Sequence, residues 1–408
     1  MEYINGGVCA AQGFKAWGVH AGVKADSDPN KKDVALILSE AECTAAAMYT
    51  TNRVKAAPIY ITMAHLEDEC AWGVIANSGN ANACAPNSHE HAEAMCAAAA
   101  KATGRNARDF VVASTGVIGQ EINVQAIVDA TPALAQGLTA DASGSDAAAQ
   151  AIMTTDTVKK EVAVQVELGG KTVTLGGIAK GSGMIHPNMG TMLCFLTSDC
   201  AISPDMLSAA LHEVVPRTFN RVTVDGDTST NDMCVVLCNA LAGNELIEWK
   251  DSSYAAFKAA LTEVLTYLSR AMAADGEGAS RLITCTVHGS RSEEAAERLS
   301  KAIVASSLVK AAMFGADANW GRVLCAMGYS KAPFRPEHVD VKFASSAGEI
   351  LVCEQGSQVL FDEDKAKEIL SQDEVIIDVN VNEGDNCATC WGCDLTYDYV
   401  KINGDYRT

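Results

Sequence analysis

The chain has 408 residues, 48% of them apolar, and its 31 basic and 51 acidic side chains give a formal net charge of −20. This composition predicts two or three globular domains rather than a disordered chain. The acidity disfavours nucleic acid and anionic membranes as partners, because both are bound through basic patches. No apolar run reaches the roughly 18 residues of a membrane span and no secretory signal is visible, so we expect a cytoplasmic protein.

Helix and strand patterns alternate along the chain, which predicts an α/β or α+β fold. An Ala-rich helix is expected at 93–103, and two alternating runs around Gly169-Gly170 predict a hairpin at 161–175. Ser203-Pro204 supplies the start signals of a helix over 203–214. Further helices are predicted at 254–273 and 292–309, and short strands at 72–76, 110–112, 221–224, 234–237, 282–287, 339–343, 375–381 and 395–400.

The segment 179–193 is unusual because small residues, a lysine and a proline precede a Gly190-Thr191 bond and an apolar run. A threonine at this place has no evident activator. If the bond before Thr191 is cut, the new α-amine, with a pKa of about 8, can act as the general base of the same residue. Gly190 suits such a cut because it adds little steric hindrance. The alternative from residue types alone is a glycine-rich loop that enters a core strand.

Two other turns carry polar groups of possible chemical use. Thr115-Gly116 follows a strand-like run and could direct a hydroxyl and a backbone N–H to one point, as an oxyanion hole requires; a plain β-turn is the alternative. Glu277 places one carboxylate in a glycine-rich turn ahead of a strand, where a solvated acid is the alternative.

Metal-binding interpretations are weaker. The acidic stretch 223–232 fails the calcium-loop spacing, because the position due for the closing Glu is Val236. Cys387, Cys390 and Cys393 have a C-x-x-C-x-x-C spacing but lack a fourth ligand, so core thiols are favoured for these three of the 15 cysteines. We therefore expect no metal centre and no cofactor.

Taken together, these segments resemble the glutamate N-acetyltransferase (ornithine acetyltransferase) family of arginine biosynthesis. The resemblance spans nearly the whole chain, and its many uncommon strings in one order make it specific. The strings that carry it are Gly13–Lys15 with Gly18-Val19, Thr50–Pro58, Asn77–Cys84, Ser114–Gly119, Lys180–Ile185, Pro187–Met189, Thr191–Leu193, Asp225–Thr228, Gly276–Ala279, Gly315–Arg322 and Val400–Thr408.

The resemblance implies a two-domain ornithine acetyltransferase-like fold with mixed sheets packed between helices, in a precursor that cuts itself before the nucleophilic threonine. Here the cut would fall between Gly190 and Thr191, giving an α chain of residues 1–190 and a β chain of residues 191–408, assembled as α2β2. The family usually has Ala before the threonine. Gly190 permits the attack but leaves the backbone freer, which predicts slower self-cleavage.

The implied reaction moves an acetyl group from N2-acetyl-L-ornithine to L-glutamate by a ping-pong route through acetyl-Thr191. Thr115 and Gly116 would supply the oxyanion hole. The family's substrate positions map onto Thr154, Lys180, Thr191, Glu277, Asn403 and Thr408. Acetyl-CoA would enter only as a second acetyl donor, and no residue distinguishes the bifunctional enzymes from the ornithine-only ones.

Three alternatives remain beside the transferase. A self-processing amidase or aminopeptidase would use the same nucleophile but pass the acyl group to water. A cysteine-rich metal or redox protein would use the thiols of 387–393. An unprocessed, inactive scaffold would result if Gly190 prevented cleavage.

Overall fold

The computed structural model describes residues 1–24, 28–186 and 192–405. The chain divides into two compact units, the first formed by Met1–Asn220 and Asp227–Leu268, the second by Arg221–Gly226 and Ser269–Arg407. Each unit has its own sheet and its own helices, so the predicted mixed α/β class is confirmed. The division between the units does not follow the predicted cut at residue 190, because residues 192–220 belong to the first unit.

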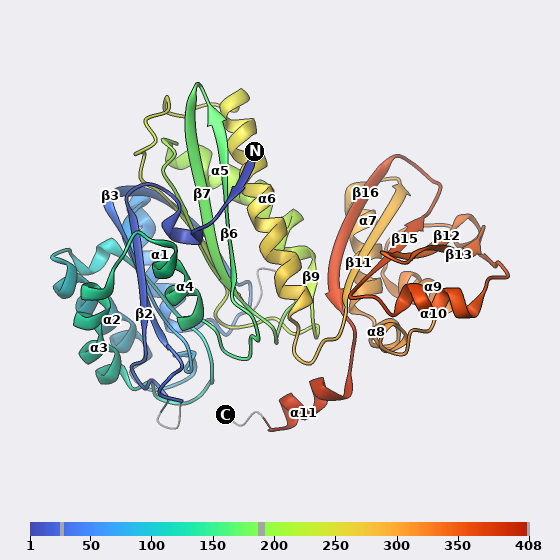
Figure 1. Ribbon diagram of the computed structural model, residues 1–408, viewed down its shortest axis with the longest axis horizontal. Coiled ribbons are helices and arrows are strands. Elements are labelled where there is room, and N and C mark those ends of the chain that lie inside the picture. Colours follow the sequence, from blue (N-terminus) through green and yellow to red (C-terminus); the bar gives the residue numbers. More distant parts are fainter. Residues whose placement is uncertain (25–27, 187–191, 406–408) are drawn as a thin grey trace. The chain divides into compact units, whose positions relative to one another are not determined.

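A nine-stranded mixed sheet forms the centre of the first unit (Figure 1). Its strands are β1 (Glu2–Ile4), β2 (Phe14–Val19), β3 (Val34–Tyr49), β4 (Cys70–Asn77), β5 (Phe110–Ser114), β6 (Lys160–Leu168), β7 (Lys171–Lys180), β8 (Leu193–Ser198) and β10 (Met233–Cys238). They follow the order β1-β6-β7-β8-β10-β3-β4-β5, and β2 pairs with β3.

Helices cover both faces of this sheet because its central strands are apolar on both sides. Along β3, Val34 and Leu36 join one core while Ala35 and Ile37 join the other, as the two-residue period of a strand requires. The helices are α1 (Ala57–His65), α2 (Ser88–Thr103), α3 (Val124–Gly137), α4 (Ala142–Ala151), α5 (Pro204–Val214) and α6 (Ser252–Ala274), the last of which ends in the second unit. Helices α2 and α3 pack in the core that contains Val34 and Leu36, and α4 packs in the core that contains Ala35 and Ile37.

The predicted hairpin is present and leads to the segment of the predicted cut. β6 and β7 pair through the Gly169-Gly170 turn, where both residues have positive φ. β7 then pairs antiparallel with β8, from Leu175 opposite Ser198 to Lys180 opposite Leu193. The connection from β7 to β8 contains Gly190 and Thr191, which lie outside the described residues. The strand that follows this connection is thus held between β7 and β10.

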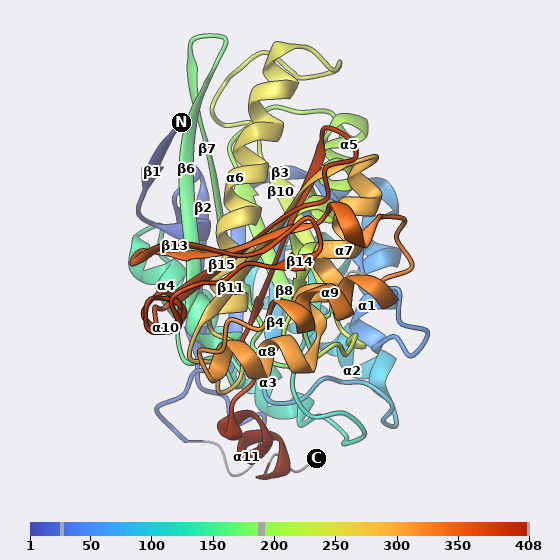
Figure 2. The same cartoon turned by 90° about the vertical axis from the view of Figure 1, so that its right-hand side faces the viewer.

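The second unit has a seven-stranded mixed sheet with one core. Its strands are β9 (Val222–Thr223), β11 (Leu282–Ser290), β12 (Asp340–Ser345), β13 (Gly348–Glu354), β14 (Ser357–Gln358), β15 (Glu374–Asn380) and β16 (Asn386–Cys393), and its helices are α7 (Glu293–Ala305), α8 (Ser307–Phe314), α9 (Trp320–Tyr329), α10 (Glu363–Leu370) and α11 (Tyr397–Asp405). The strand order is β14-β13-β12-β15-β11-β16-β9. Helices α7 to α10 pack against this sheet through a shared apolar core (Figure 2).

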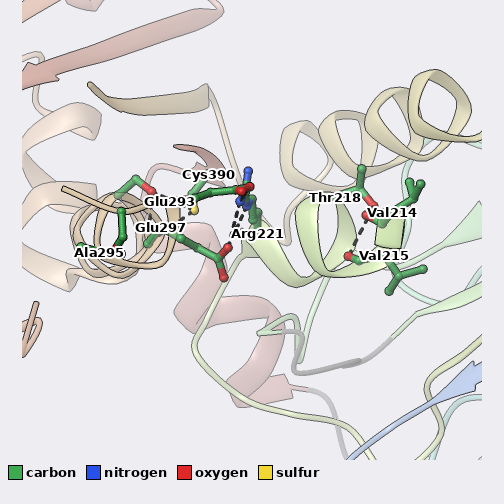
Figure 3. A network of polar contacts seen from close by, with 10 residues as sticks. Val214, Val215, Thr218, Arg221, Glu293, Ala295, Glu297 and Cys390 are labelled. Atoms are coloured by element: carbon green, nitrogen blue, oxygen red, sulfur yellow. Dashed lines mark hydrogen bonds and ion pairs between the residues drawn. The ribbon is translucent and has the colours of Figure 1, made fainter. Parts of the chain in front are cut away.

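Arg221 fixes the short segment 221–226 in the second unit. Its Nε donates to Glu297 Oε2 at 3.0 Å and its Nη2 to Glu293 Oε1 at 2.8 Å, both on α7 (Figure 3). Its side chain is only 9% exposed. Since β9 begins at the next residue and pairs in parallel with β16, this ion pair sets where the strand joins the sheet.

Two predicted elements differ from the structure. The single helix expected at 292–309 is two helices, because Ser306 ends α7 and its hydroxyl accepts the N–H of Val309 at the start of α8. The strand expected at 395–400 is wrong, since α11 begins at Tyr397. There the Thr396 hydroxyl accepts the Asp398 N–H and donates to the Gly278 carbonyl, and this contact across the fold outweighs the β propensity of the run.

Candidate active site

Lys180 is the last residue of β7 and lies opposite Leu193, the first residue of β8. It is only 3% exposed. A buried lysine at a strand end offers a charge that an anionic group can meet with little competition from water. The predicted residues Gly190, Thr191 and Thr408 lie outside the described residues. At this end of the sheet the structure describes Lys180 and the starts of β8 and β10.

Asp156 brings two predicted substrate residues together. Its Oδ2 accepts the N–H of Thr154 at 3.0 Å, and its Oδ1 accepts the N–H of Gly181, next to Lys180, at 2.8 Å. Lys160 donates to the same carboxylate at 2.7 Å. Burial alone would raise the pKa of Asp156, but the charges of Lys180 and Lys160 outweigh it and hold that pKa well below its usual range. The carboxylate is therefore ionised and fixes both segments.

The predicted oxyanion turn has the geometry that glycine alone permits. Gly116 has φ +130°, and a Cβ there would lie 2.4 Å from the carbonyl carbon of Gly79. The backbone N–H of Thr115 donates to the Asn77 carbonyl at 3.0 Å. Within the described residues, neither the hydroxyl of Thr115 nor the N–H of Gly116 makes a hydrogen bond. Two donors in one turn therefore remain available to a ligand.

A two-residue segment connects this turn to the start of β8. The Asn231 amide donates to the carbonyl of Ser114, which precedes Thr115, at 2.8 Å. The Asp232 carboxylate accepts the N–H of Met192, which follows the predicted nucleophile, at 2.7 Å. The oxyanion turn and the start of β8 are thus attached to adjacent residues of one segment.

The second unit brings two of the predicted substrate residues, Glu277 and Asn403, into contact. The Asn403 amide donates to Glu277 Oε2 at 2.7 Å. Gly278 has φ +68°, and a Cβ there would meet the backbone N of Tyr399 at 2.6 Å, so only glycine lets the turn lie against the start of α11. Asp394 also accepts the N–H groups of Ser280 and Arg281. The carboxylate of Glu277 is half-buried in a turn supported from several sides.

Sequence reasoning missed the buried acids that shape these sites. Asp156, Asp232 and Asp394 are each at most 8% exposed. Two of them carried a visible signal: Asp232 directly precedes the apolar strand β10, and Asp394 directly follows β16. A lone acid at the end of an apolar strand is rarely buried without a partner, so it marks a place where backbone donors converge.

The cysteines of 387–393 do not face one another as a ligand set. Cys387 is exposed, whereas Cys390 accepts a hydrogen bond from the Ser300 hydroxyl at 3.1 Å within the core. Cys393 contacts Lys310 Nζ at 3.5 Å, and it lies three residues along the strand from Cys390, on the other face of the sheet. In the part of the chain that the structure describes, no group of three His, Cys, Asp or Glu side chains could hold a metal ion.

Comparison with a solved structure gives the class of protein. The crystal structure of an arginine biosynthesis bifunctional protein from Bacillus halodurans aligns with a TM-score of 0.50 at 44% identity, covering 52% of this chain and 98% of that one. The mixed α/β fold is thus that of an ornithine acetyltransferase-like enzyme of arginine biosynthesis.

The chain belongs to the ArgJ family, whose family model matches residues 15–408. Curated relatives agree over the full length. Arginine biosynthesis bifunctional protein ArgJ 1 of Clostridium acetobutylicum is 47% identical over 97% of this chain and 96% of that protein. Its counterpart in Symbiobacterium thermophilum is 49% identical over 100% of both chains. Among the helices of the described residues, none has the length and apolar character needed to cross a membrane.

Proposed function

We propose that this enzyme carries out the acetyl transfer of its family through a threonine that it frees by cutting itself between Gly190 and Thr191. The observation that carries the proposal is the gathering of Lys180, the Thr115-Gly116 turn and the start of β8 around one sheet end. Membership of the ArgJ family makes the chain a glutamate N-acetyltransferase of arginine biosynthesis.

The reaction uses the hydroxyl of Thr191 in two steps. Thr191 Oγ attacks the acetyl carbonyl of N2-acetyl-L-ornithine, while its α-amine takes the hydroxyl proton and then passes it to the leaving nitrogen, so that ornithine departs as the C–N bond breaks. The amine of L-glutamate next attacks the acetyl ester and restores the Thr191 hydroxyl. The available donors of Thr115 and Gly116 fit the negative oxygen that forms in both steps.

The substrate residues divide by charge. Lys180 suits the carboxylate that both amino acids carry, and Thr154 lies on the same Asp156 support. Glu277, oriented by Asn403, suits the side-chain ammonium of ornithine. We propose the same binding role for Thr408 on the strength of the family resemblance.

The two pieces would remain together after the cut. β7 of the first piece pairs with β8 of the second over six residue pairs, and β10 of the second pairs with β3 of the first over six more. The length of the solved relative supports a cut near the middle, since almost all of that chain matches only 52% of this one. We propose that the enzyme is cytoplasmic and assembles as α2β2. Native mass spectrometry would test the assembly by measuring the stoichiometry of the two pieces.

The relatives are named bifunctional, which favours a second acetyl donor. We infer that acetyl-CoA also acetylates Thr191, after which glutamate takes the acetyl group as before. No resident cofactor is needed for either step, because the acetyl donor is itself a substrate. Release of free CoA that depends on glutamate would distinguish this activity from slow hydrolysis.

Denaturing mass spectrometry of the purified protein is the decisive experiment. Fragments matching residues 1–190 and 191–408 are expected, and the Thr191→Ala variant should give a single full-length mass and no transfer. Thr115→Ala should lower kcat roughly 10²–10³-fold, the cost of one oxyanion donor. Clean cleavage of the Thr191→Ala variant at the same bond would refute the mechanism, and turnover without formation of N-acetylglutamate would favour the amidase.

A further inference from the structure

The segment Asn231-Asp232 has no role in the reaction as described so far. In sequence it ends an acidic stretch that looks at first like a cation loop. In the structure both side chains are buried, Asn231 at 7% and Asp232 at 0% exposed. Two adjacent buried polar side chains are costly unless they satisfy other groups, so their partners show what they do.

Asp232 holds the residue that follows the predicted nucleophile. Its Oδ1 accepts the N–H of Met192 at 2.7 Å, and this N–H belongs to the peptide bond that joins residue 191 to Met192. The Met192 carbonyl in turn accepts the N–H of Met233 at 3.0 Å. The carbonyl of Asp232 is itself fixed, because it accepts the N–H of Thr50, the residue after β3. Met192 is therefore bound on both sides of its backbone.

Asn231 holds the other half of the site. Its amide donates to the Ser114 carbonyl at 2.8 Å and to the Ala81 carbonyl at 2.6 Å. The first carbonyl belongs to the peptide bond that leads into Thr115. The second lies in the 77–82 loop, which contains Gly79, the residue packed against Gly116. The turn with the two available donors is thus attached to Asn231 from two directions.

We propose that Asn231 and Asp232 are positioning residues that hold Met192, the residue after the proposed nucleophile, in register with the oxyanion turn. Because they are consecutive, their Cα atoms are held about 3.8 Å apart by one rigid peptide unit, and burial restricts the two short side chains that make the attachments. This inference rests on the proposed function, since it assigns the two residues to the Thr191 reaction. An acyl transfer needs its nucleophile and its oxyanion donors in register to a fraction of an ångström.

The role of Asp232 needs an acceptor rather than a charge. Burial raises the pKa of Asp232 well above its usual value, and the opposing effects of the Met192 N–H, of the Thr50 hydroxyl and of Lys180 are smaller. Its Oδ2 has no hydrogen-bond partner within the described residues. An asparagine at this position would keep the acceptor at Oδ1, so Asp232→Asn is the conservative variant and Asp232→Ala the disruptive one.

Asp199 offers a matched control, because it lies at the far end of β8, whereas Asp232 holds the start of that strand through Met192. It follows β8, is 4% exposed, and accepts the N–H groups of Thr174 at 2.7 Å and of Gln12 at 3.1 Å. Its pKa is likewise raised by burial. Asp199→Ala therefore removes a buried carboxyl with backbone partners from β8 without touching either attachment of Asn231-Asp232. It measures the purely structural cost of such a change.

The experiment compares these variants in the full chain. Appearance of the 191–408 fragment is followed by mass spectrometry after purification, and the cleaved enzymes are assayed for transfer from N2-acetyl-L-ornithine to L-glutamate. Asp232→Ala should slow cleavage and lower kcat by roughly 10- to 100-fold, with KM within about threefold. Asp232→Asn should stay within about fivefold of the native enzyme. Asp199→Ala should lower the melting temperature but leave cleavage and kcat within about twofold.

Each result decides for or against the proposal. The proposal would be overturned if Asp232→Ala cleaved and turned over as fast as Asp199→Ala. It would also be overturned if Asp232→Asn lost as much cleavage and kcat as Asp232→Ala, because that result would indicate a charge effect. If Asp232→Ala does not fold, Asn231→Ala decides, because it should lower kcat roughly tenfold at unchanged KM. A native enzyme that neither cleaves nor transfers would overturn the proposed function, whereas normal native activity with unaffected variants would overturn only this inference.

Discussion

Asp156→Asn should destabilise the first unit strongly. The substitution keeps the shape of the side chain but removes the negative charge that faces Lys160 and Lys180, which are 1% and 3% exposed. The Asp156–Lys160 pair is itself almost fully buried, with an N–O distance of 2.7 Å. Removing one member of a buried ion pair typically costs about 3–5 kcal/mol, because the desolvated partner loses its countercharge. We expect a loss within this range.

Urea denaturation of the Thr191→Ala precursor would measure this loss in a chain that stays uncut. The double variant Asp156→Asn, Lys160→Met serves as the control, since it removes both charges of the pair together. With Lys160→Met measured alone, the double variant should lose less than the sum of the two single losses by about 0.5–3 kcal/mol, the usual coupling of contacting residues. A single-variant loss under about 1 kcal/mol, or a double variant that loses the sum of both changes, would refute the reasoning.

The same carboxylate predicts an acid dependence of stability. Its pKa in the folded chain lies below the unfolded value of about 3.9, so its contribution is complete above that pH and disappears as the pH falls through the folded pKa. The melting temperature of the native chain should therefore fall more steeply below about pH 4 than that of Asp156→Asn. Parallel melting curves from pH 5 to pH 2 would argue against an ionised Asp156.

Two further predictions concern the reaction. Gly116→Ala should lower kcat roughly 10²–10³-fold, because the new methyl group would displace the turn. Gly119 also has a positive φ, +83°, but open space where a Cβ would lie, so Gly119→Ala should change kcat by less than about threefold. Equal effects of the two substitutions would contradict the oxyanion role. Glu277→Gln should raise KM for N2-acetyl-L-ornithine roughly 10- to 100-fold through loss of a charge-assisted hydrogen bond, and Asn403→Ala should raise it only a few-fold; an unchanged KM in steady-state kinetics would remove Glu277 from substrate binding.

The sequence predicted best where local rules decide the structure. The Gly169-Gly170 hairpin, the Ser203 cap of α5 and the long helix α6 follow from residues close in the chain, and the structure confirms all three. The strand expected at 395–400 failed because a distant carbonyl, that of Gly278, holds the Thr396 hydroxyl that starts α11. Local propensity cannot predict a contact between residues so far apart in the chain.

The candidate site divides in the same way. The Thr115-Gly116 turn and Lys180 stand out in sequence because small residues and a lone charge interrupt apolar strands. The roles of Asp156 and Asp232 could not be predicted in this way, because each also holds a distant backbone N–H, that of Gly181 at 25 residues and that of Met192 at 40. Which acid becomes a buried acceptor depends on strand order, and the spacing of residues along the chain did not yield that order.

The place of β8 and β10 in the first sheet also sets an order of events. Both strands follow Thr191 in the chain, yet they lie between β7 and β3, which precede it. Residues 1–190 alone would leave β7 and β3 as two unpaired edges, which invite aggregation. Under the proposed cleavage the chain must fold before it is cut, so the bond before Thr191 serves assembly and is dispensable afterwards. Pieces produced from two separate genes should therefore fail to reconstitute an enzyme that the nicked native protein maintains.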